Sequence, residues 1–141
     1  MSGVTGHKKI LPCLDIKDGK VVVGQQFSNV KAVDDPLTLA KYYNTSGADE
    51  LIMYDISASL ENRQVFGELL KEIRNAVTLP LTVGGGIQSL EDIQRVLALG
   101  ANKVSINSGA IKDPLLLRES VKEFGSGAIV LSIDVRKITD R

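Results

Sequence analysis

The stretch LTVGGGIQSLEDIQRVLALGANKVSIN, residues 81–107, contains two short apolar runs separated by a helical segment. The first run ends in three glycines and the second ends at Asn107. The segment between them begins at Ser89, a favoured N-cap residue with an acid three positions later, and closes at Gly100. Short apolar runs on either side of a capped helix predict a βαβ unit, in which the two strands are parallel.

The same alternation extends in both directions along the chain. Apolar runs that end in polar residues or glycine predict five strands, at Ile10 to Leu14, Leu51 to Tyr54, Leu81 to Val83, Val104 to Ile106 and Ile129 to Ile133. Capping signals and apolar spacing predict four helices, from Asp35-Pro36 to Gly47, around the stripe Val65 to Val77, from Ser89 to Gly100, and from Asp113-Pro114 to Gly125. Runs of Val, Ile and Leu without strict polar alternation are typical of a parallel sheet covered by helices.

This order of elements predicts an α/β fold, and specifically a partial (β/α)8 TIM barrel with five parallel strands and four helices, as a single domain over residues 1–141. An open, doubly wound sheet fits the same order. Its glycine fingerprint is missing after the first strand, however, where DIKDG (residues 15–19) stands instead. Because a complete barrel needs about 250 residues, we expect the chain to be part of a longer protein rather than a free-standing enzyme.

Composition narrows the class of ligand. Seventeen Lys and Arg balance seventeen Asp and Glu, so no overall field favours nucleic acid or an anionic membrane. The first residues lack the apolar segment of a signal peptide, and Cys13 has no second cysteine to pair with. We therefore expect a soluble, cytoplasmic protein that binds a small molecule and needs neither a metal nor a cofactor.

Acidic residues follow the first and fifth predicted strands. In (β/α)8 barrels the catalytic groups lie where strands end, and strands one and five stand opposite each other in the ring. Asp15 and Asp134 are therefore candidates for an acid and base pair that face each other across a ligand, with Asp55 after the second strand as a further candidate. The alternative is that each of these acids only forms a turn or caps a helix.

The glycine triplet Gly84, Gly85 and Gly86 lies between a strand and a helix, where backbone amides can approach and bind a phosphate. Asn107 and Ser108 follow the next strand, so the two loops can converge on one anion. A tight turn without a ligand is the alternative explanation of the glycines.

Charged residues also stand at the opposite ends of the strands. Lys9, Glu50 and Lys103 precede the first, second and fourth strands, so we expect them at the lower face of the barrel, where such rings usually stabilise the fold. Cys13 lies within an apolar run, which predicts a buried and unreactive thiol.

Several motifs together resemble one family. They are PCLDIKDG (12–19), GADEL (47–51), DISAS (55–59), LTVGGGI (81–87) and KVSIN (103–107). The chain is similar over nearly its whole length to the cyclase subunit of imidazole glycerol phosphate synthase. The related barrel isomerase of histidine biosynthesis shares the glycine triplet but not DISAS or KVSIN, and it remains an alternative.

The resemblance implies a cytoplasmic lyase that takes ammonia from a glutaminase partner. Its substrate would be a ribulosyl aminoimidazole-carboxamide with a phosphate at each end, and its products imidazole glycerol phosphate and an aminoimidazole-carboxamide ribonucleotide (AICAR). By position, Asp15 and Asp134 look like the catalytic acid and base, with Lys17 and Asp55 on the active-site rim. Gly86, Asn107 and Ser108 resemble the first phosphate site, and the lower charged ring resembles the passage for ammonia.

Two departures from the family pattern bear on these expectations. Val23 stands in the loop after the first strand, where the family usually has a lysine that holds the substrate. The second phosphate site is expected from strands six to eight, so we expect little turnover from this chain alone. A non-catalytic phosphate-binding module is therefore an alternative function. Unpaired edges on strands one and five lead us to expect self-association.

Overall fold

The computed structural model describes residues 6–25, 28–57 and 59–138. These residues form one sheet of seven strands in the order β3-β2-β1-β4-β5-β6-β7. Strands β1, β4, β5, β6 and β7 are parallel, while β2 and β3 are antiparallel to their neighbours. The strands are β1 Cys13–Lys17, β2 Lys20–Gln25, β3 Ser28–Asp34, β4 Leu51–Asp55, β5 Leu81–Gly84, β6 Lys103–Ile106 and β7 Ile129–Leu131.

The helices connect successive parallel strands. They are α1 Pro36–Thr45, α2 Leu60–Ala76, α3 Leu90–Ala98, α4 Ser108–Lys112 and α5 Pro114–Phe124, with a short 3-10 helix, η1 Ser126–Ala128, before β7. The N-caps predicted from the sequence are confirmed, because the side chains of Asp35, Ser89 and Asp113 each accept a hydrogen bond from a backbone N–H in the first turn. None of the described helices is long and apolar enough to cross a membrane.

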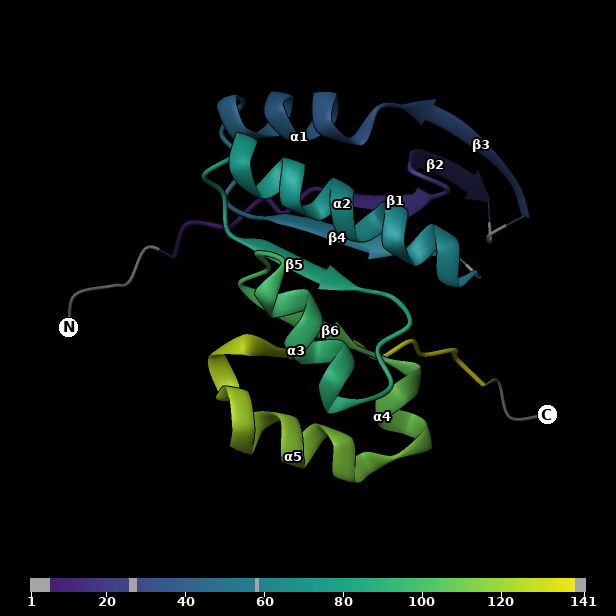
Figure 1. Ribbon diagram of the computed structural model, residues 1–141, viewed down its shortest axis with the longest axis vertical. Helices are drawn as coiled ribbons and strands as arrows, with labels where there is room; N and C mark the ends of the chain where they lie inside the picture. Colours follow the sequence, from purple (N-terminus) through teal and green to yellow (C-terminus); the bar gives the residue numbers. More distant parts are fainter. Residues whose placement is uncertain (1–5, 26–27, 58, 139–141) are drawn as a thin grey trace.

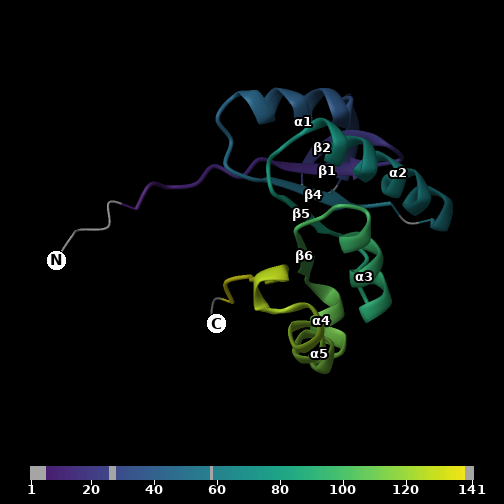
Figure 2. The same ribbon diagram turned by 60° about the vertical axis from the view of Figure 1, so that its left-hand side comes forward.

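The arrangement of strands and helices distinguishes the two folds that the sequence allowed. The five parallel strands lie side by side in chain order, with no reversal of the kind that defines a doubly wound sheet. In Figure 2, helices α1, α2, α3 and α5 follow one arc around the strands. The α/β class and the five parallel strands are thus confirmed, in the arrangement expected for successive units of a barrel.

The two faces of the sheet differ in burial. Leu14, Met53, Val83 and Val104 are register neighbours on four adjacent strands and are 3%, 0%, 1% and 0% exposed. They pack under the helices, and burying each such side chain contributes about 1.5–3 kcal/mol. Side chains on the other face alternate with these. That face, called the open face below, carries the register row Asp15, Tyr54, Gly84, Ser105 and Val130.

The first predicted strand is displaced and its edge is covered, both contrary to prediction. Strand β1 begins three residues later than predicted, so Asp15 lies inside the strand instead of following it. Asp18 and Gly19 have φ values of 51° and 76° and form a tight turn that pairs Lys17 with Lys20. The β2–β3 hairpin therefore covers this edge of β1. Val23 lies within β2, not in a loop, and its side chain is exposed.

Two further features of the fold differ from prediction. The described residues contain five α-helices, not four, because α4 forms directly after Asn107. Strand β7 ends at Leu131, two residues earlier than predicted. The other strands agree with prediction to within one residue, and β1, β4 and β5 all point to the same side of the molecule (Figure 1). Their carboxyl ends therefore share one rim.

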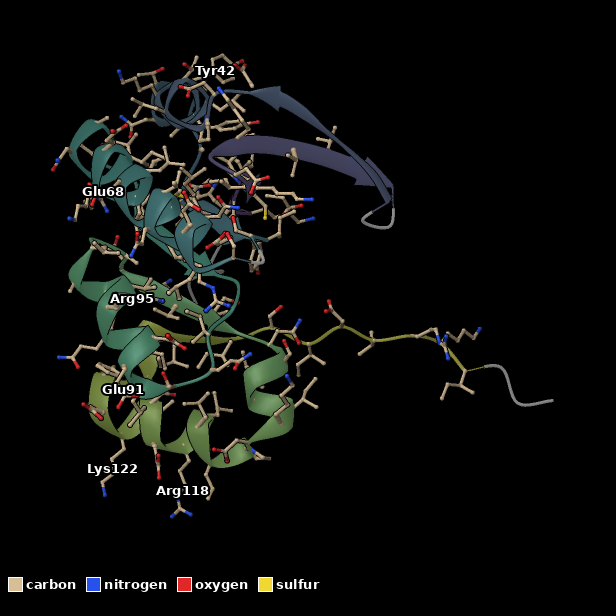
Figure 3. All side chains as sticks on the ribbon, turned by 45° about the vertical axis from the view of Figure 1, so that its right-hand side comes forward. Tyr42, Glu68, Glu91, Arg95, Arg118 and Lys122 are labelled. Atoms are coloured by element: carbon tan, nitrogen blue, oxygen red, sulfur yellow. The ribbon has the colours of Figure 1, made fainter. Side chains whose placement is uncertain are left out.

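The outer surface of the helices is charged. Arg118 and Lys122 project from α5 away from the sheet (Figure 3), and both are exposed. The stripe predicted along α2 faces inward in part, since Phe66, Leu70 and Ile73 are buried while Val65 is 44% exposed.

Candidate active site

Asp15 lies on the open face of the sheet. It is half-buried and stands between Leu14 and Ile16, which are buried against the helices on the opposite face. Its register neighbour is Tyr54 on β4. The Tyr54 hydroxyl lies 3.5 Å from Ser105 Oγ on β6. A carboxylate, a phenol and an alcohol thus line one row of the open face across three strands.

Asn107 and Asp134 come together at the carboxyl ends of β6 and β7. The Asn107 side-chain amide donates a hydrogen bond of 2.7 Å to Asp134 Oδ2. Asn107 is also the N-cap residue of α4, where its side chain makes no capping bond. Ser108 follows as the first residue of α4 and is exposed. Strands β4, β5 and β6 separate Asp15 from Asp134, so a molecule that touches both must span the row between them.

The three consecutive glycines, called the glycine loop below, serve different steric needs. Gly84 is buried in β5, and a Cβ there would lie 2.5 Å from Cε1 of the Tyr54 ring. Gly85 has φ +99°, and its Cβ would overlap the backbone carbonyl oxygen of Asp55. Gly86 has φ +66°, and its Cβ would have room, with Arg63 Nη2 at 3.5 Å. Packing therefore requires glycine at the first two positions, whereas at Gly86 only the positive φ favours glycine.

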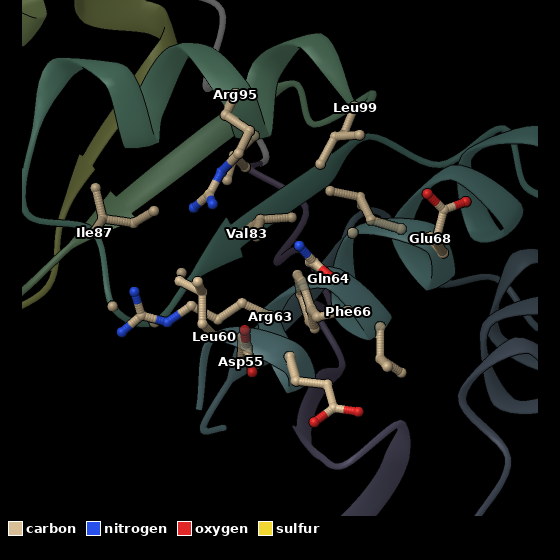
Figure 4. A pocket seen from close by; sticks show the side chains of 18 residues that line it. Asp55, Leu60, Arg63, Gln64, Phe66, Glu68, Val83, Ile87, Arg95 and Leu99 are labelled. Atoms are coloured by element: carbon tan, nitrogen blue, oxygen red, sulfur yellow. The ribbon is translucent and has the colours of Figure 1, made fainter. Parts of the chain in front are cut away.

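A cavity of about 680 Å³ opens between α2 and α3, and the glycine loop forms one end of it (Figure 4). Asp55 lines this cavity and accepts a hydrogen bond of 2.9 Å from the backbone N–H of Ser57. Asp15, Asn107 and Asp134 do not line it. The structure thus places Asp55 on the helix side of the sheet, away from Asp15, and the glycine loop between the two regions.

The charged residues at the other ends of the strands form a compact cluster. Glu50 is 9% exposed, and its Oε1 lies 3.9 Å from Lys9 Nζ and 3.4 Å from Lys103 Nζ. The structure therefore brings together the three residues predicted for the lower face. One buried carboxylate thus lies between two ammonium groups, and the cluster carries a net positive charge.

Lys17 and Cys13 also lie on the open face of β1, and both side chains are exposed. The prediction that Cys13 is buried is wrong, because the alternation of β1 directs it away from the helices. Partial burial is the larger cause, and the nearby Asp15 carboxylate the smaller cause, that raises the pKa of the Cys13 thiol to about 11. The thiol is therefore protonated at neutral pH and is a weak nucleophile.

Sequence reasoning missed three residues that the structure places at these sites, namely Tyr54, Ser105 and Arg63. Two of them had a visible signal. Tyr54 and Ser105 are polar residues inside apolar strands; Tyr54 stands directly before Asp55, and Ser105 stands two positions before Asn107. Arg63 had no such signal, since it is one of several charged residues along α2.

Comparison with known proteins shows the family of this chain. A model of the family described as "Histidine biosynthesis protein" matches residues 9–140. The chain belongs to this family. The subunit named "Imidazole glycerol phosphate synthase subunit HisF" from Lactococcus lactis subsp. lactis is 49% identical over 133 residues, 94% of this chain and 51% of the relative. The subunit of that name from Methanocaldococcus jannaschii is 49% identical, over 92% of this chain and 48% of the relative.

A third subunit of the same name, from Exiguobacterium sp., is 50% identical over 92% of this chain and 51% of its own length. This member of the histidine biosynthesis family thus spans about half the length of the curated relatives it matches. The resemblance to the synthase subunit, found from the motifs alone, is confirmed.

Proposed function

We propose that this chain carries part of the active site of a cyclase, a lyase that makes imidazole glycerol phosphate and AICAR from a ribulosyl aminoimidazole-carboxamide bearing two phosphates. The main support for this proposal is the row of polar groups on the open face, which begins at Asp15 and ends at the Asn107–Asp134 pair. The identity of about 49% to the synthase subunits supports assigning this row to their reaction.

In this proposal Asp15 and Asp134 act as acid and base. Ring closure requires a proton to leave one atom of the substrate while another atom receives one, and two carboxyl groups at separate positions can do both. Asn107 donates to one oxygen of Asp134 and so fixes the direction of that carboxylate. Lys17, exposed at the end of β1, stands at the rim, where its ammonium group attracts the anionic substrate.

The glycine loop, Asn107 and Ser108 hold one phosphate of the substrate. The described residues offer no hydrogen-bond acceptor to the backbone N–H groups of Gly85 and Gly86, so these donors are available to an anion. Asp55 supports the loop from the helix side through its backbone, next to Gly85. The second phosphate is bound outside this chain, by strands that follow β7 in the family's barrel.

Ammonia enters at the opposite end of the strands, where Lys9, Glu50 and Lys103 form their cluster. It comes from a glutaminase subunit that docks at this face, and the protein works in the cytoplasm without a metal or cofactor. These statements rest on the family, since the relatives are themselves named as synthase subunits.

The test is reconstitution. The chain is mixed with the C-terminal half of the subunit from Lactococcus lactis, and loss of substrate is followed with ammonium as the nitrogen source. Asp15→Asn and Asp134→Asn should each lower turnover by about 10²–10⁴-fold. Glu119→Gln, which changes an exposed carboxylate on α5, should leave it unchanged. Absence of turnover in every such complex would refute the cyclase assignment.

A non-catalytic phosphate-binding module is the second candidate, favoured by Val23 at a position where the family has a substrate-binding lysine. Phosphate binding that survives in Asp15→Asn, without turnover in any complex, would favour the module. The pathway isomerase is distinguished by a product assay with its own substrate.

We also propose self-association through β7, whose outer edge pairs with no strand among the described residues, and through the segment 132–138 that follows it. Leu131 on β7 and Ile133, Val135 and Ile138 after it are 44%, 66%, 88% and 80% exposed.

A further inference from the structure

Arg63, on the first turn of α2, lacks a charged partner. It is half-buried, and it forms no ion pair with any carboxylate among the described residues. The other arginines that face this part of the fold are satisfied. Arg95 pairs with Asp92 at 3.4 Å, and Arg74 donates to Asn102 Oδ1 at 2.9 Å. The Arg63 guanidinium keeps contact with solvent and has no acceptor among the described residues, so its N–H donors are free to bind an anion.

The guanidinium of Arg63 is directed at the glycine loop. Its Nη2 lies 3.5 Å from the point that a Cβ on Gly86 would occupy. The backbone N–H groups of Gly85 and Gly86 have no acceptor among the described residues. Unpaired cationic and amide donors thus come together at one end of the cavity between α2 and α3, where Figure 4 shows Arg63 beside Ile87.

Beyond the glycine loop the cavity lining has an apolar part, together with the polar side chains of Gln64, Glu68 and Arg95. Val83 and Phe66 form its floor, and Val96 and Leu99 form the wall on α3. At the far end a Cβ on Gly67 would lie 3.4 Å from Leu99 Cδ1, so the two helices are nearly in contact there. The space accommodates a small planar or apolar group, and its polar end is the glycine loop.

Three carboxylates also line the cavity, but none competes for Arg63. Asp55 Oδ1 accepts from Ser57 N, and Glu68 pairs with Lys71 at 3.5 Å on the outer surface. Glu61 is exposed. At the glycine end, Arg63 is the cationic group next to Gly86.

We propose that the α2–α3 cavity binds a small organic phosphate, whose phosphate group is held by Arg63 and the amides of Gly85 and Gly86 and whose apolar body lies against Val83 and Leu99. The inference rests on the proposed function only in using the same glycine loop. It adds Arg63 as an anion-binding residue and adds a pocket on the helix side of the sheet. An arginine can donate two parallel hydrogen bonds to a phosphate, which a lysine cannot.

The experiment titrates the full chain with inorganic phosphate and with phenyl phosphate, and follows the amide resonances of Gly85 and Gly86 by NMR. Phenyl phosphate should bind more tightly than inorganic phosphate. Arg63→Gln should weaken both by about tenfold or more, and Arg63→Lys should restore part of this loss. Gln64→Trp, which fills the cavity from an exposed position, should weaken phenyl phosphate alone. Arg118→Gln, on the outer side of α5, should change neither.

Unchanged binding of both probes in Arg63→Gln would overturn the inference. If Asn107→Ala then lost inorganic phosphate, the phosphate site of the proposed function would stand and only the role of Arg63 would fail. If wild-type protein bound neither probe, both the inference and the proposed phosphate site would be refuted. Equal affinity for the two probes would show that the phenyl group makes no favourable contact in the cavity, and this would overturn the proposal.

Discussion

Replacing Gly85 with alanine tests whether the glycine loop is required by the fold. At φ +99° an alanine lies outside the left-handed region that non-glycine residues tolerate, a strain of about 1–3 kcal/mol. Its Cβ would also overlap the Asp55 carbonyl oxygen, and relieving such overpacking costs typically about 1–3 kcal/mol. The two effects together predict that Gly85→Ala lowers the free energy of unfolding by about 2–6 kcal/mol.

Gly86→Ala is the matched control, one residue away in the same loop. Its φ of +66° lies in the left-handed region, where an alanine costs about 1–2 kcal/mol. The nearest atom to its Cβ is Arg63 Nη2 at 3.5 Å, an ordinary contact, so no overpacking is added. The smaller conformational entropy of the unfolded chain offsets part of this cost, by about 0.4–1 kcal/mol. A net loss of about 1 kcal/mol is expected.

The assay is urea denaturation followed by circular dichroism. The free energies of unfolding of both variants and wild-type protein are compared, provided that their m values agree. Complete loss of the cooperative transition in Gly85→Ala counts as the larger effect. Equal destabilisation by the two substitutions, or a smaller effect at Gly85, would refute the steric reasoning. It would also mean that the approach of the loop to the Asp55 backbone does not constrain this position.

Three further outcomes are expected. Asp35→Ala should destabilise the protein by about 1 kcal/mol, because it removes the N-cap of α1. The Thr38 amide lowers the pKa of Asp35 below 3.8, so this stabilisation is present above that pH and is lost in acid, and denaturation of variant and wild type should converge there. Asp15→Asn should lower the pKa of Cys13 from about 11 towards 9.0 and speed its alkylation at pH 9, whereas an unchanged rate would argue against their proximity. Glu50→Gln should cost up to about 1 kcal/mol, a difference that shrinks as salt is added and that denaturation at two ionic strengths measures.

The capped helices could be predicted because their signals are local. Asp35, Ser89 and Asp113 each cap a helix through a backbone N–H only two or three residues away. The buried strands could be predicted for a related reason, since burial under helices requires continuous apolar residues. The cluster around Glu50 followed from strand direction alone, because parallel strands bring their starting residues to one edge.

The turn between β1 and β2 has an equally local signal. Asp18-Gly19, followed by Lys20 and three valines, is typical of a two-residue turn between strands, and both residues adopt positive φ. The apolar run that ends at Leu14 predicts a first strand that begins too early, and on that prediction the turn falls in a loop. Pro12 lies next to β4 without belonging to a strand, and its carbonyl oxygen accepts from Ile52 N.

The cavity between α2 and α3 could not be predicted from the sequence. It depends on how closely two helices approach, and this is set by Gly67 against Leu99, residues 32 positions apart. The pairing of Asn107 with Asp134 likewise joins loops whose distance is fixed only by the order of the strands. Periodicity indicates which face of an element is buried, but not which side chains meet across a gap.

The glycine loop shows why a motif alone cannot separate packing from binding. Gly84 accommodates the Tyr54 ring on the open face, and Gly85 accommodates the Asp55 backbone. Both would be needed in a protein that binds nothing. Gly86 has a positive φ but no such close contact, and the side chain nearest its Cβ position is that of Arg63. Evidence for a ligand therefore has to come from the third position. A substitution there that leaves the protein folded but abolishes phosphate binding would separate the two causes, which substitutions at Gly84 or Gly85 cannot do.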